Sequence, residues 1–332
     1  GAKLTTVTAN AGRGAATLTV ASTAGIKVGQ WVRIQQTDAG GSMLSTYYGG
    51  AFPGDVAEDA DKQLFDVYSP VTAVTATTIT LARTMPFPVD TRWKPTILAR
   101  APNTTEIGVE HLTMKFLGTK YPGHFKERGF NAIDFGGVQD SWVRDVVIVN
   151  ADYGVTLNGD FFCTGTDIVL DTDFDRGPLV GHHGLNSSSG EGILYTRFDV
   201  KKTFVHDLTV DDYAFATVWS NGKGVDLNMD HHGRAPYGTL WTALDMGAGT
   251  RAFGSGGSAG RMPHTGAYST VWNLVASKAL TRPDASFGPL YNFVAMAGDK
   301  TTPAVTGWSV EVIDRTKLCQ PDLHAAMLAR RP

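Results

Sequence analysis

Apolar and polar residues alternate with a period of two in several short runs near the start of the chain. These runs are rich in β-branched residues and are separated by glycine, proline and polar turns. They are Ala16–Val20, Gly25–Ile34, Val71–Val74 and Thr77–Leu81. Alternation of this kind is typical of strands with one buried face. We therefore predict a small β-rich module over residues 1–100, packed on or inserted into the rest of the chain.

From about residue 101 onward a different pattern recurs: an apolar residue, two residues of any kind, an apolar residue, one residue of any kind, and a third apolar residue. The matches are Val109/Leu112/Met114, Val143/Val146/Ile148, Ile193/Thr196/Phe198, Val205/Leu208/Val210, Trp241/Leu244/Met246, Val271/Leu274/Ala276, Leu290/Phe293/Ala295 and Val305/Trp308/Val310. Gly, Asn, Asp and Pro between the matches supply turns. Units too short to bury their own apolar face indicate strands that stack in successive coils.

Several folds could use such strands. The runs are rich in Val, Ile, Thr and aromatic residues and are interrupted by glycine, which favours strands over helices. A doubly wound sheet would need helices between the strands, and a β-sandwich would have more evenly spaced turns. We therefore predict an all-β chain in which residues 101–332 form a parallel β-helix. Only Pro321–Arg330 has the character of a helix, with Asp322 as its N-cap.

Part of this second region resembles a known superfamily. The segments Ile107–Phe116, Ala132–Phe135, Asp140–Asn150 and Asn150–Val155 resemble successive coils of right-handed parallel β-helix proteins of the pectate-lyase-like superfamily. The resemblance covers about two thirds of the chain. It implies a right-handed β-helix and a carbohydrate ligand, because the superfamily includes polysaccharide lyases, glycoside hydrolases, glycan transferases, epimerases and phage tailspikes. No segment matches a catalytic motif of these families, so residue roles are inferred from chemistry.

Composition narrows the classes of partner. The chain has 332 residues, a net charge of −3, 18% charged residues and 38 glycines, which suits a turn-rich all-β fold. The slightly acidic balance and the lack of a Lys/Arg run argue against nucleic acid, and no apolar run is long enough to predict a membrane helix. Cys163 follows two phenylalanines and is predicted to be a small buried residue. We expect a secreted or periplasmic protein, although the sequence that starts at Gly1 does not open with the pattern of a signal peptide. The oligomeric state stays open.

Polar side chains are concentrated in the stretch Val225–Arg251. They are Asp226, Asn228, Asp230, His231, His232, Arg234 and Tyr237. In a chain with few charges, such crowding is typical of a site that transfers protons or binds an anion. The alternative is a loop whose polar groups hydrogen-bond to one another and to the backbone.

The residue types in this stretch suit β-elimination on a uronic-acid glycan. That reaction needs a cation for the uronate carboxylate, a base for the C5 proton and an acid for the leaving oxygen. Arginine binds carboxylates through two bonds, and a neutral imidazole accepts a proton. We predict that Arg234 and Arg251 bind the carboxylate, that His231 or His232 is the base, and that Tyr237 is the acid. Further predicted substrate contacts are His182, His183, Arg197, Lys202, Asn228 and Trp219.

Two other functions stay open. A glycoside hydrolase or glycan transferase could use Asp226 and Asp230 as paired carboxylates, and a glycan-binding or tailspike-like module would have no activity. In each case the predicted partner is a polysaccharide or oligosaccharide.

Metal binding is a separate question. The repeated tripeptides His182-His183-Gly and His231-His232-Gly offer imidazoles to a transition metal. Adjacent residues on a strand face opposite sides, so at most one histidine of each pair should reach a shared site. We assign no metal ligand and no required cofactor. Whether the protein binds a divalent cation such as Ca²⁺ stays an open question.

Overall fold

The computed structural model describes residues 1–37, 42–47, 63–100, 104–257, 266–298, 305 and 307–331, with the backbone alone at 63–65 and 286. The described chain divides into two compact units, Gly1–Pro102 and Asn103–Pro332.

The first unit is a six-stranded antiparallel sheet with the strand order β1-β6-β3-β4-β5-β2. A bridge between Val7 and Val20 joins the ends of the two edge strands, so the sheet closes on itself. Alternate residues such as Ile79 and Leu81 are buried, as the period of two predicts. One helix was not predicted: α1 buries Met43 in the glycine-rich interval between two strands. The elements are β1 (Lys3–Thr6), β2 (Thr17–Thr19), β3 (Trp31–Thr37), α1 (Ser42–Tyr47), β4 (Gln63–Val74), β5 (Thr78–Leu81), a 3₁₀ helix (Thr91–Trp93) and β6 (Thr96–Ala99).

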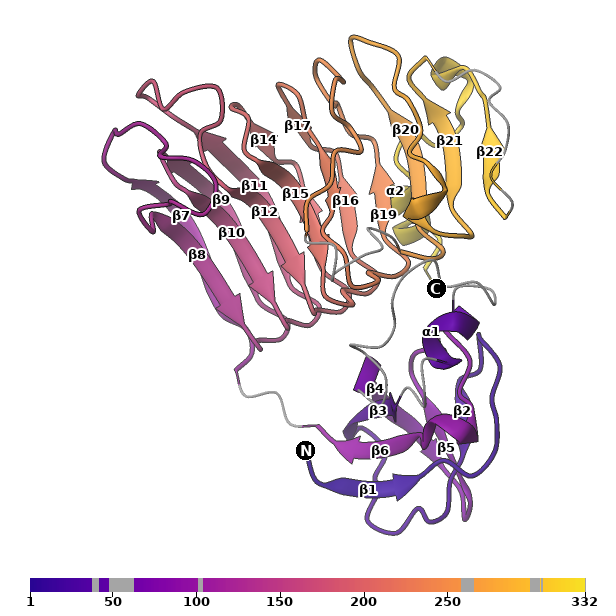
Figure 1. Cartoon of the computed structure of the whole chain (residues 1–332). Coiled ribbons are helices and arrows are strands. Elements are labelled where there is room, and N and C mark those ends of the chain that lie inside the picture. The colour runs from indigo at the N-terminus through magenta and orange to yellow at the C-terminus, as the bar shows by residue number, and fades with distance from the viewer. Residues whose placement is uncertain are drawn as a thin grey trace. The chain divides into compact units, whose positions relative to one another are not determined.

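The second unit has two parallel sheets, which we call the short sheet and the long sheet (Figure 1). The short sheet consists of β8 (Asn131–Gly136), β10 (Tyr153–Asn158), β12 (His183–Ser188), β15 (His206–Asp211) and β18 (Met229–His231). The long sheet consists of β7 (Gly108–Lys115), β9 (Trp142–Val149), β11 (Thr164–Asp171), β13 (Leu194–Thr196), β14 (Asp199–Val200), β16 (Val218–Ser220), β17 (Lys223–Gly224), β19 (Leu240–Thr242), β20 (Thr270–Leu274), β21 (Asn292–Met296) and β22 (Ser309–Glu311).

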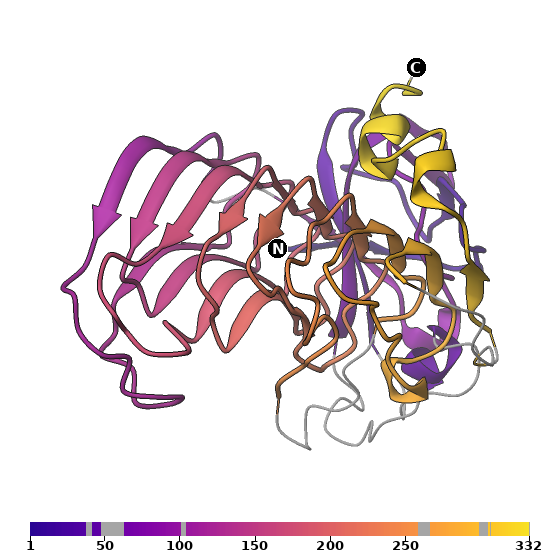
Figure 2. The ribbon, with the colours of Figure 1, turned by 90° about the horizontal axis from the view of Figure 1, so that it is seen from above.

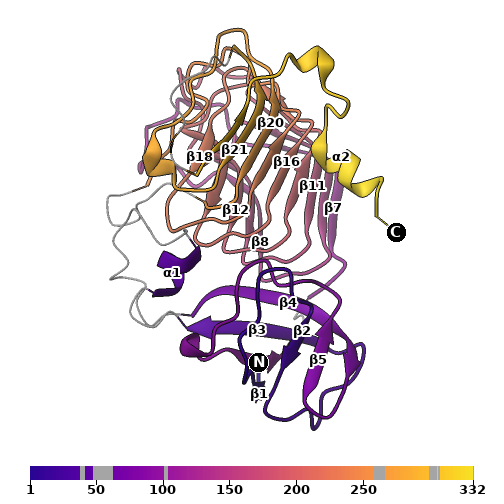
Figure 3. The same ribbon diagram turned by 90° about the vertical axis from the view of Figure 1, so that its right-hand side faces the viewer.

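From β7 to β18 the chain alternates between the two sheets, whereas β19 to β22 all belong to the long sheet, and neighbouring strands in each sheet come from successive coils. Figures 1 and 2 show the strands side by side in a stack, and Figure 3 views that stack from its C-terminal end. The fold is a right-handed parallel β-helix, which confirms the predicted fold class. Because the coils are in register, equivalent residues form columns. One interior column of the short sheet contains Ile133, Val155, Leu185, Leu208 and Met229.

A left-handed residue explains the recurring apolar pattern in the long sheet. The residues at one equivalent place in six successive coils all have φ between 51° and 56°; they are His111, Asp145, Asp167, Arg197, Asn221 and Ala243. A left-handed residue interrupts the simple alternation of a strand. Side chains therefore point inward at the first, fourth and sixth positions of the pattern.

Aromatic rings fill part of the long sheet's interior column. Tyr195, Trp219 and Trp241 are in register, with ring centroids 4.6 Å and 5.3 Å apart and nearly parallel planes. All three are fully buried. Trp219 was predicted to contact substrate. That prediction is wrong, because its register position turns the ring into the core.

The C-terminal helix α2 (Leu323–Leu328) confirms the predicted helix, and Asp322 accepts a hydrogen bond from His324 N at 3.0 Å as its N-cap. Short 3₁₀ helices precede it at Ala285–Phe287 and Arg315–Lys317. Cys163 is fully buried, as predicted. None of the described helices has the length and apolar character that a membrane crossing requires.

Candidate functional site

The outer face of the short sheet carries polar residues in register. Tyr153, His183 and His206 form one outward column, and Thr209 lies beside Asp230 in another. Thr209 and Asp230 lie next to interior positions on their strands, so their side chains leave the core. His183 and His206 instead stand at the first positions of β12 and β15, and His183 lines a surface pocket. The β-helix therefore places histidines from different coils next to one another, about one strand spacing (~4.8 Å) apart.

Two loops close over this face and form a pocket of about 530 Å³. The loop between β7 and β8 contributes His124 and Phe125, and the connection between β19 and β20 contributes Gly256 and Gly257. Glycine is needed at 256, because a Cβ there would lie 2.2 Å from the His206 ring. The described lining, which we call the histidine pocket, is His124, Phe125, His183, Asp211, His232, Gly256 and Gly257.

Asp230 lies beneath the pocket and organises it. Its side chain is fully buried. Oδ2 accepts hydrogen bonds from His232 Nδ1 at 2.8 Å and Thr209 Oγ1 at 3.1 Å, and Oδ1 accepts one from Gly256 N at 2.7 Å. His206 Nδ1 also lies 3.1 Å from Oδ2. Burial acts to raise the pKa of Asp230, but the His206 and His232 imidazoles outweigh it and hold the pKa below its usual range. Asp230 is therefore an ionised carboxylate that can only accept.

The ionised carboxylate determines two imidazole tautomers. His232 must carry a proton on Nδ1 to donate to Asp230. Thr209 donates its only proton to Asp230. His183 Nδ1, 2.9 Å from the Thr209 hydroxyl, must therefore be the donor in that pair. In the neutral form, both His183 and His232 carry their lone pair on Nε2.

A second set of contacts extends the cluster. His182 Nε2 lies 2.8 Å from His124 Nε2, while His182 Nδ1 lies 2.7 Å from the Tyr153 hydroxyl and 3.2 Å from Glu127 Oε1. Burial, with the nearby His124 imidazole, lowers the pKa of His182 to about 4. Burial and the His206 imidazole lower the pKa of His183 as well. These imidazoles are neutral at pH 7, so they can accept protons from hydroxyl or carbon acids or bind a metal ion.

The structure brings four of the predicted site residues together. His183 and His232 line the histidine pocket, while His182 and Asp230 lie against it. The two members of the His182–His183 pair both reach the cluster, with ring centroids 4.5 Å apart. They do so because β12 begins only at His183.

Two predicted catalytic residues lie elsewhere: one faces the interior of the β-helix, and the other is buried in a turn between the two sheets. His231 is fully buried, with Nε2 2.7 Å from the Tyr291 hydroxyl and Nδ1 3.0 Å from Met229 O. It packs against Trp241, so it is not the base. Tyr237 is 1% exposed in the turn between the sheets, where its ring contacts Phe215 and Tyr268. Its predicted role as the acid is wrong, because a substrate cannot reach it.

Two further predicted ligand contacts have structural partners. Arg251 bonds to the carboxylate of Asp207 and donates to Phe204 O at 2.7 Å. Asn228 is 3% exposed and accepts a hydrogen bond from Asp207 N at 2.7 Å. Arg251 thus neutralises a protein carboxylate rather than that of a substrate.

The remaining predicted residues are dispersed. Asp226 accepts a hydrogen bond from Thr250 N at 2.8 Å and does not pair with Asp230. Arg234 lies 3.5 Å from Asp212. Arg197 belongs to the long sheet, and Lys202 is exposed on the connection that follows β14. None of these lies in the described lining of the histidine pocket.

Sequence reasoning missed His124 and His206. His206 could have been found by aligning the coils, because His183-Gly-Leu and His206-Asp-Leu occupy the same register. His124 has no such signal, since it lies in a loop outside the repeat.

No protein-family model and no curated protein matches the sequence. Among solved structures, the chain resembles the tailspike gp61 of Pseudomonas phage phi297, with a TM-score of 0.53 and 12% identity over 89% of this chain and 44% of that one. It also resembles the tailspike Gp54 of Acinetobacter baumannii bacteriophage AP22, solved with A. baumannii capsular saccharide (TM-score 0.37, 11% identity, 88% and 55% covered). A third is the tailspike gp49 of Pseudomonas phage LKA1 (TM-score 0.33, 10% identity, 93% and 58% covered). The chain thus spans about half the length of these proteins, and the first likeness shows the β-helix fold.

Proposed function

We propose that this chain binds a polysaccharide on the outer face of the short sheet and cleaves it in the histidine pocket. One observation carries the proposal: the buried, ionised Asp230 holds His232 in the tautomer whose Nε2 can take a proton. A carboxylate that orients an imidazole in this way is a recurring arrangement for general-base catalysis. A polysaccharide substrate implies that the protein acts in the periplasm or outside the cell.

The reaction we propose is β-elimination at a uronic acid. His232 Nε2 takes the C5 proton, a double bond forms between C4 and C5, and the bond from C4 to the glycosidic oxygen breaks. The leaving oxygen takes a proton from water, and His232 gives the C5 proton to the hydroxide that remains, which restores the neutral imidazole. The described lining of the pocket has no lysine or arginine, so the uronate carboxylate needs a bound cation or N–H donors to offset its charge.

Hydrolysis by paired carboxylates has less support. Glycosidases place two carboxyl groups on either side of the scissile bond. Asp230 is fully buried under the imidazoles, and Asp226 bonds to Thr250 instead. A glycan-binding module without turnover is the second candidate, and the absence of a lysine or arginine from the described lining favours it.

A substrate screen tests the proposal. The chain is incubated with uronic and neutral polysaccharides, and both ultraviolet absorbance from unsaturated sugars and new reducing ends are followed. We expect both signals on a uronic-acid glycan, lost in Asp230→Asn and kept in the surface control His111→Gln. Reducing ends without absorbance would contradict β-elimination. Binding without either signal would identify a binding module, and neither binding nor cleavage would overturn the proposed function.

A further inference from the structure

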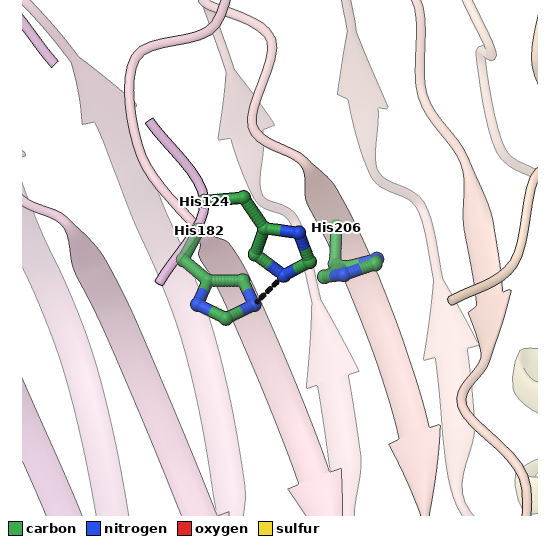
Figure 4. A group of neighbouring side chains, drawn as sticks. All are labelled: His124, His182 and His206. Carbon is green, nitrogen blue, oxygen red and sulfur yellow. Dashed lines mark hydrogen bonds between the residues drawn. The ribbon is translucent and has the colours of Figure 1, made fainter. Parts of the chain in front are cut away.

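Three imidazoles from separate parts of the second unit converge beside the histidine pocket. His124 comes from the loop between β7 and β8, His182 directly precedes β12, and His206 begins β15. One ring nitrogen from each lies within 4.8 Å of the other two. Figure 4 shows the three rings gathered together, with the dashed contact joining His124 and His182.

Carboxylates lie behind two of these rings. Glu127 Oε1 is 3.2 Å from His182 Nδ1, and Asp230 Oδ2 is 3.1 Å from His206 Nδ1. The Tyr121 hydroxyl donates to Glu127 at 2.7 Å and holds that carboxylate in place. A carboxylate at Nδ1 is the usual outer-shell partner of a histidine that binds metal through Nε2, because it orients the ring and makes it a better ligand.

His206 gives an independent indication. The residue is 4% exposed, yet neither of its ring nitrogens has a hydrogen-bond partner among the described residues, although Nδ1 lies close to the Asp230 carboxylate. A buried polar nitrogen without a partner costs about 1–3 kcal/mol, and native proteins rarely tolerate one without a reason. His124 Nε2 and His182 Nε2 face each other at 2.8 Å. An ion placed among the three nitrogens would satisfy all of them.

We propose that His124, His182 and His206 bind a divalent transition-metal ion of the Zn²⁺ class through Nε2. Glu127 and Asp230 are the positioning residues. Imidazole nitrogen suits zinc and its neighbours, whereas Ca²⁺ and Mg²⁺ prefer oxygen ligands. Three protein ligands leave one position of a tetrahedral ion for water or for an anionic group of a ligand.

This site does not depend on the proposed function, although the two are compatible. A cation there would supply the positive charge that the described pocket lining lacks. His183, His206 and His232 form an overlapping group of three nearby nitrogens. We assign the ion to the first group because the Nε2 atoms of His124 and His182 already face each other at 2.8 Å, an assignment that keeps His232 Nε2 for its proposed role as the base.

Direct metal binding tests the inference without any activity assay. The full chain, with the exposed Cys319 changed to serine to remove a competing thiol, is stripped with a chelator. It is then titrated with Zn²⁺, Co²⁺ and Ca²⁺. We expect one Zn²⁺ per chain, a Co²⁺ absorbance spectrum of tetrahedral type and no comparable affinity for Ca²⁺.

Matched variants locate the ion. His124 is exposed, so His124→Gln should fold normally and yet lose Zn²⁺ affinity by about 100-fold or more, whereas Glu127→Gln should lose about 10–100-fold. His232→Gln and the surface control His111→Gln should keep it. Unchanged Zn²⁺ affinity in His124→Gln, a larger loss in His232→Gln, or preference for Ca²⁺ would each overturn the assignment. Loss of glycan cleavage in His232→Gln with intact Zn²⁺ binding would leave both proposals standing.

Discussion

The interior of the β-helix and the outer face of the short sheet use similar side chains for different purposes. His231 faces inward and bonds to Tyr291, whereas the next residue, His232, faces outward and bonds to Asp230. The interior ring stack of Tyr195, Trp219 and Trp241 is closed to solvent. In the outer cluster, buried histidines open onto a pocket. In a stacked fold, the face of the strand that carries a histidine or tryptophan decides whether its ring packs in the core or is available to a ligand.

The largest expected effect comes from the carboxylate beneath the outer cluster. The Asp230 carboxylate accepts hydrogen bonds from three donors, which are His232 Nδ1, the Thr209 hydroxyl and the Gly256 N–H. Asp230→Asn puts an amide NH₂ against at least one of them and no longer fixes the His232 tautomer. We expect glycan cleavage to fall by about 10²–10⁴-fold, as measured by initial rates of ultraviolet absorbance. A wild-type rate in this variant would contradict the assignment of the catalytic site to the outer face of the short sheet.

Substitutions in the interior of the β-helix should lower stability rather than glycan cleavage. Trp219→Ala should lower the free energy of unfolding by about 3–5 kcal/mol, because it opens a cavity between Tyr195 and Trp241. Trp219→Phe keeps a ring in the stack and should cost less. Urea unfolding measures both. Both variants should still cleave the glycan under conditions where they are folded. A selective loss of glycan affinity would instead indicate that Trp219 contacts the glycan.

A buried carboxylate sharpens the comparison through pH. Asp160 is fully buried and accepts a hydrogen bond from Val138 N at 2.9 Å. No cation among the described residues offsets its burial, which raises its pKa to about 6. The folded state therefore holds the Asp160 proton more tightly than the unfolded state. The resulting stabilisation is present below pH 4 and is lost as the pH rises through 6.

Asp160→Asn removes this pH dependence. From pH 4 to 7, its free energy of unfolding relative to wild type should rise by roughly 2 kcal/mol, as measured by urea unfolding at several pH values. The exposed Asp167 is a control of opposite sign, because the hydrogen bond from Arg197 lowers its pKa. A pH-independent difference between Asp160→Asn and wild type would contradict the assignment.

The smallest effect should come from the outer face of the long sheet. Arg197 bonds to Asp167 at 2.8 Å and 2.7 Å, but its side chain is 60% exposed. Arg197→Gln should change the free energy of unfolding by less than about 1 kcal/mol and leave glycan cleavage unchanged. Loss of cleavage in this variant would move the functional surface to the long sheet.

Much of the fold could be predicted because apolar columns leave a readable pattern. The pattern found the inward positions at Val109, Val143, Trp241 and Val271. It missed the coil that begins with Gly165, where a Cβ would lie 2.5 Å from the Tyr195 ring. There the neighbouring coil's aromatic ring fills the space, and a single sequence does not show what lies in the next coil.

The site was harder to predict for a related reason. Asp230 and His232 were visible as local crowding of polar residues, and His182 and His183 as one copy of a repeated tripeptide. His124 reaches it through a loop outside the repeat, and Arg251 is engaged by Asp207 from another coil. Local composition identified where polar groups gather, but the register between coils decides which of them meet.

The adjacent pair His231 and His232 tests the central claim most directly. Each is changed to glutamine in the same chain, and glycan cleavage and urea unfolding are measured together. We expect His232→Gln to lose cleavage with little change in stability. His231→Gln should keep cleavage and lose about 1–3 kcal/mol of stability, because the Tyr291 hydroxyl loses a buried partner. Full cleavage by His232→Gln, or its selective loss in His231→Gln, would contradict the account.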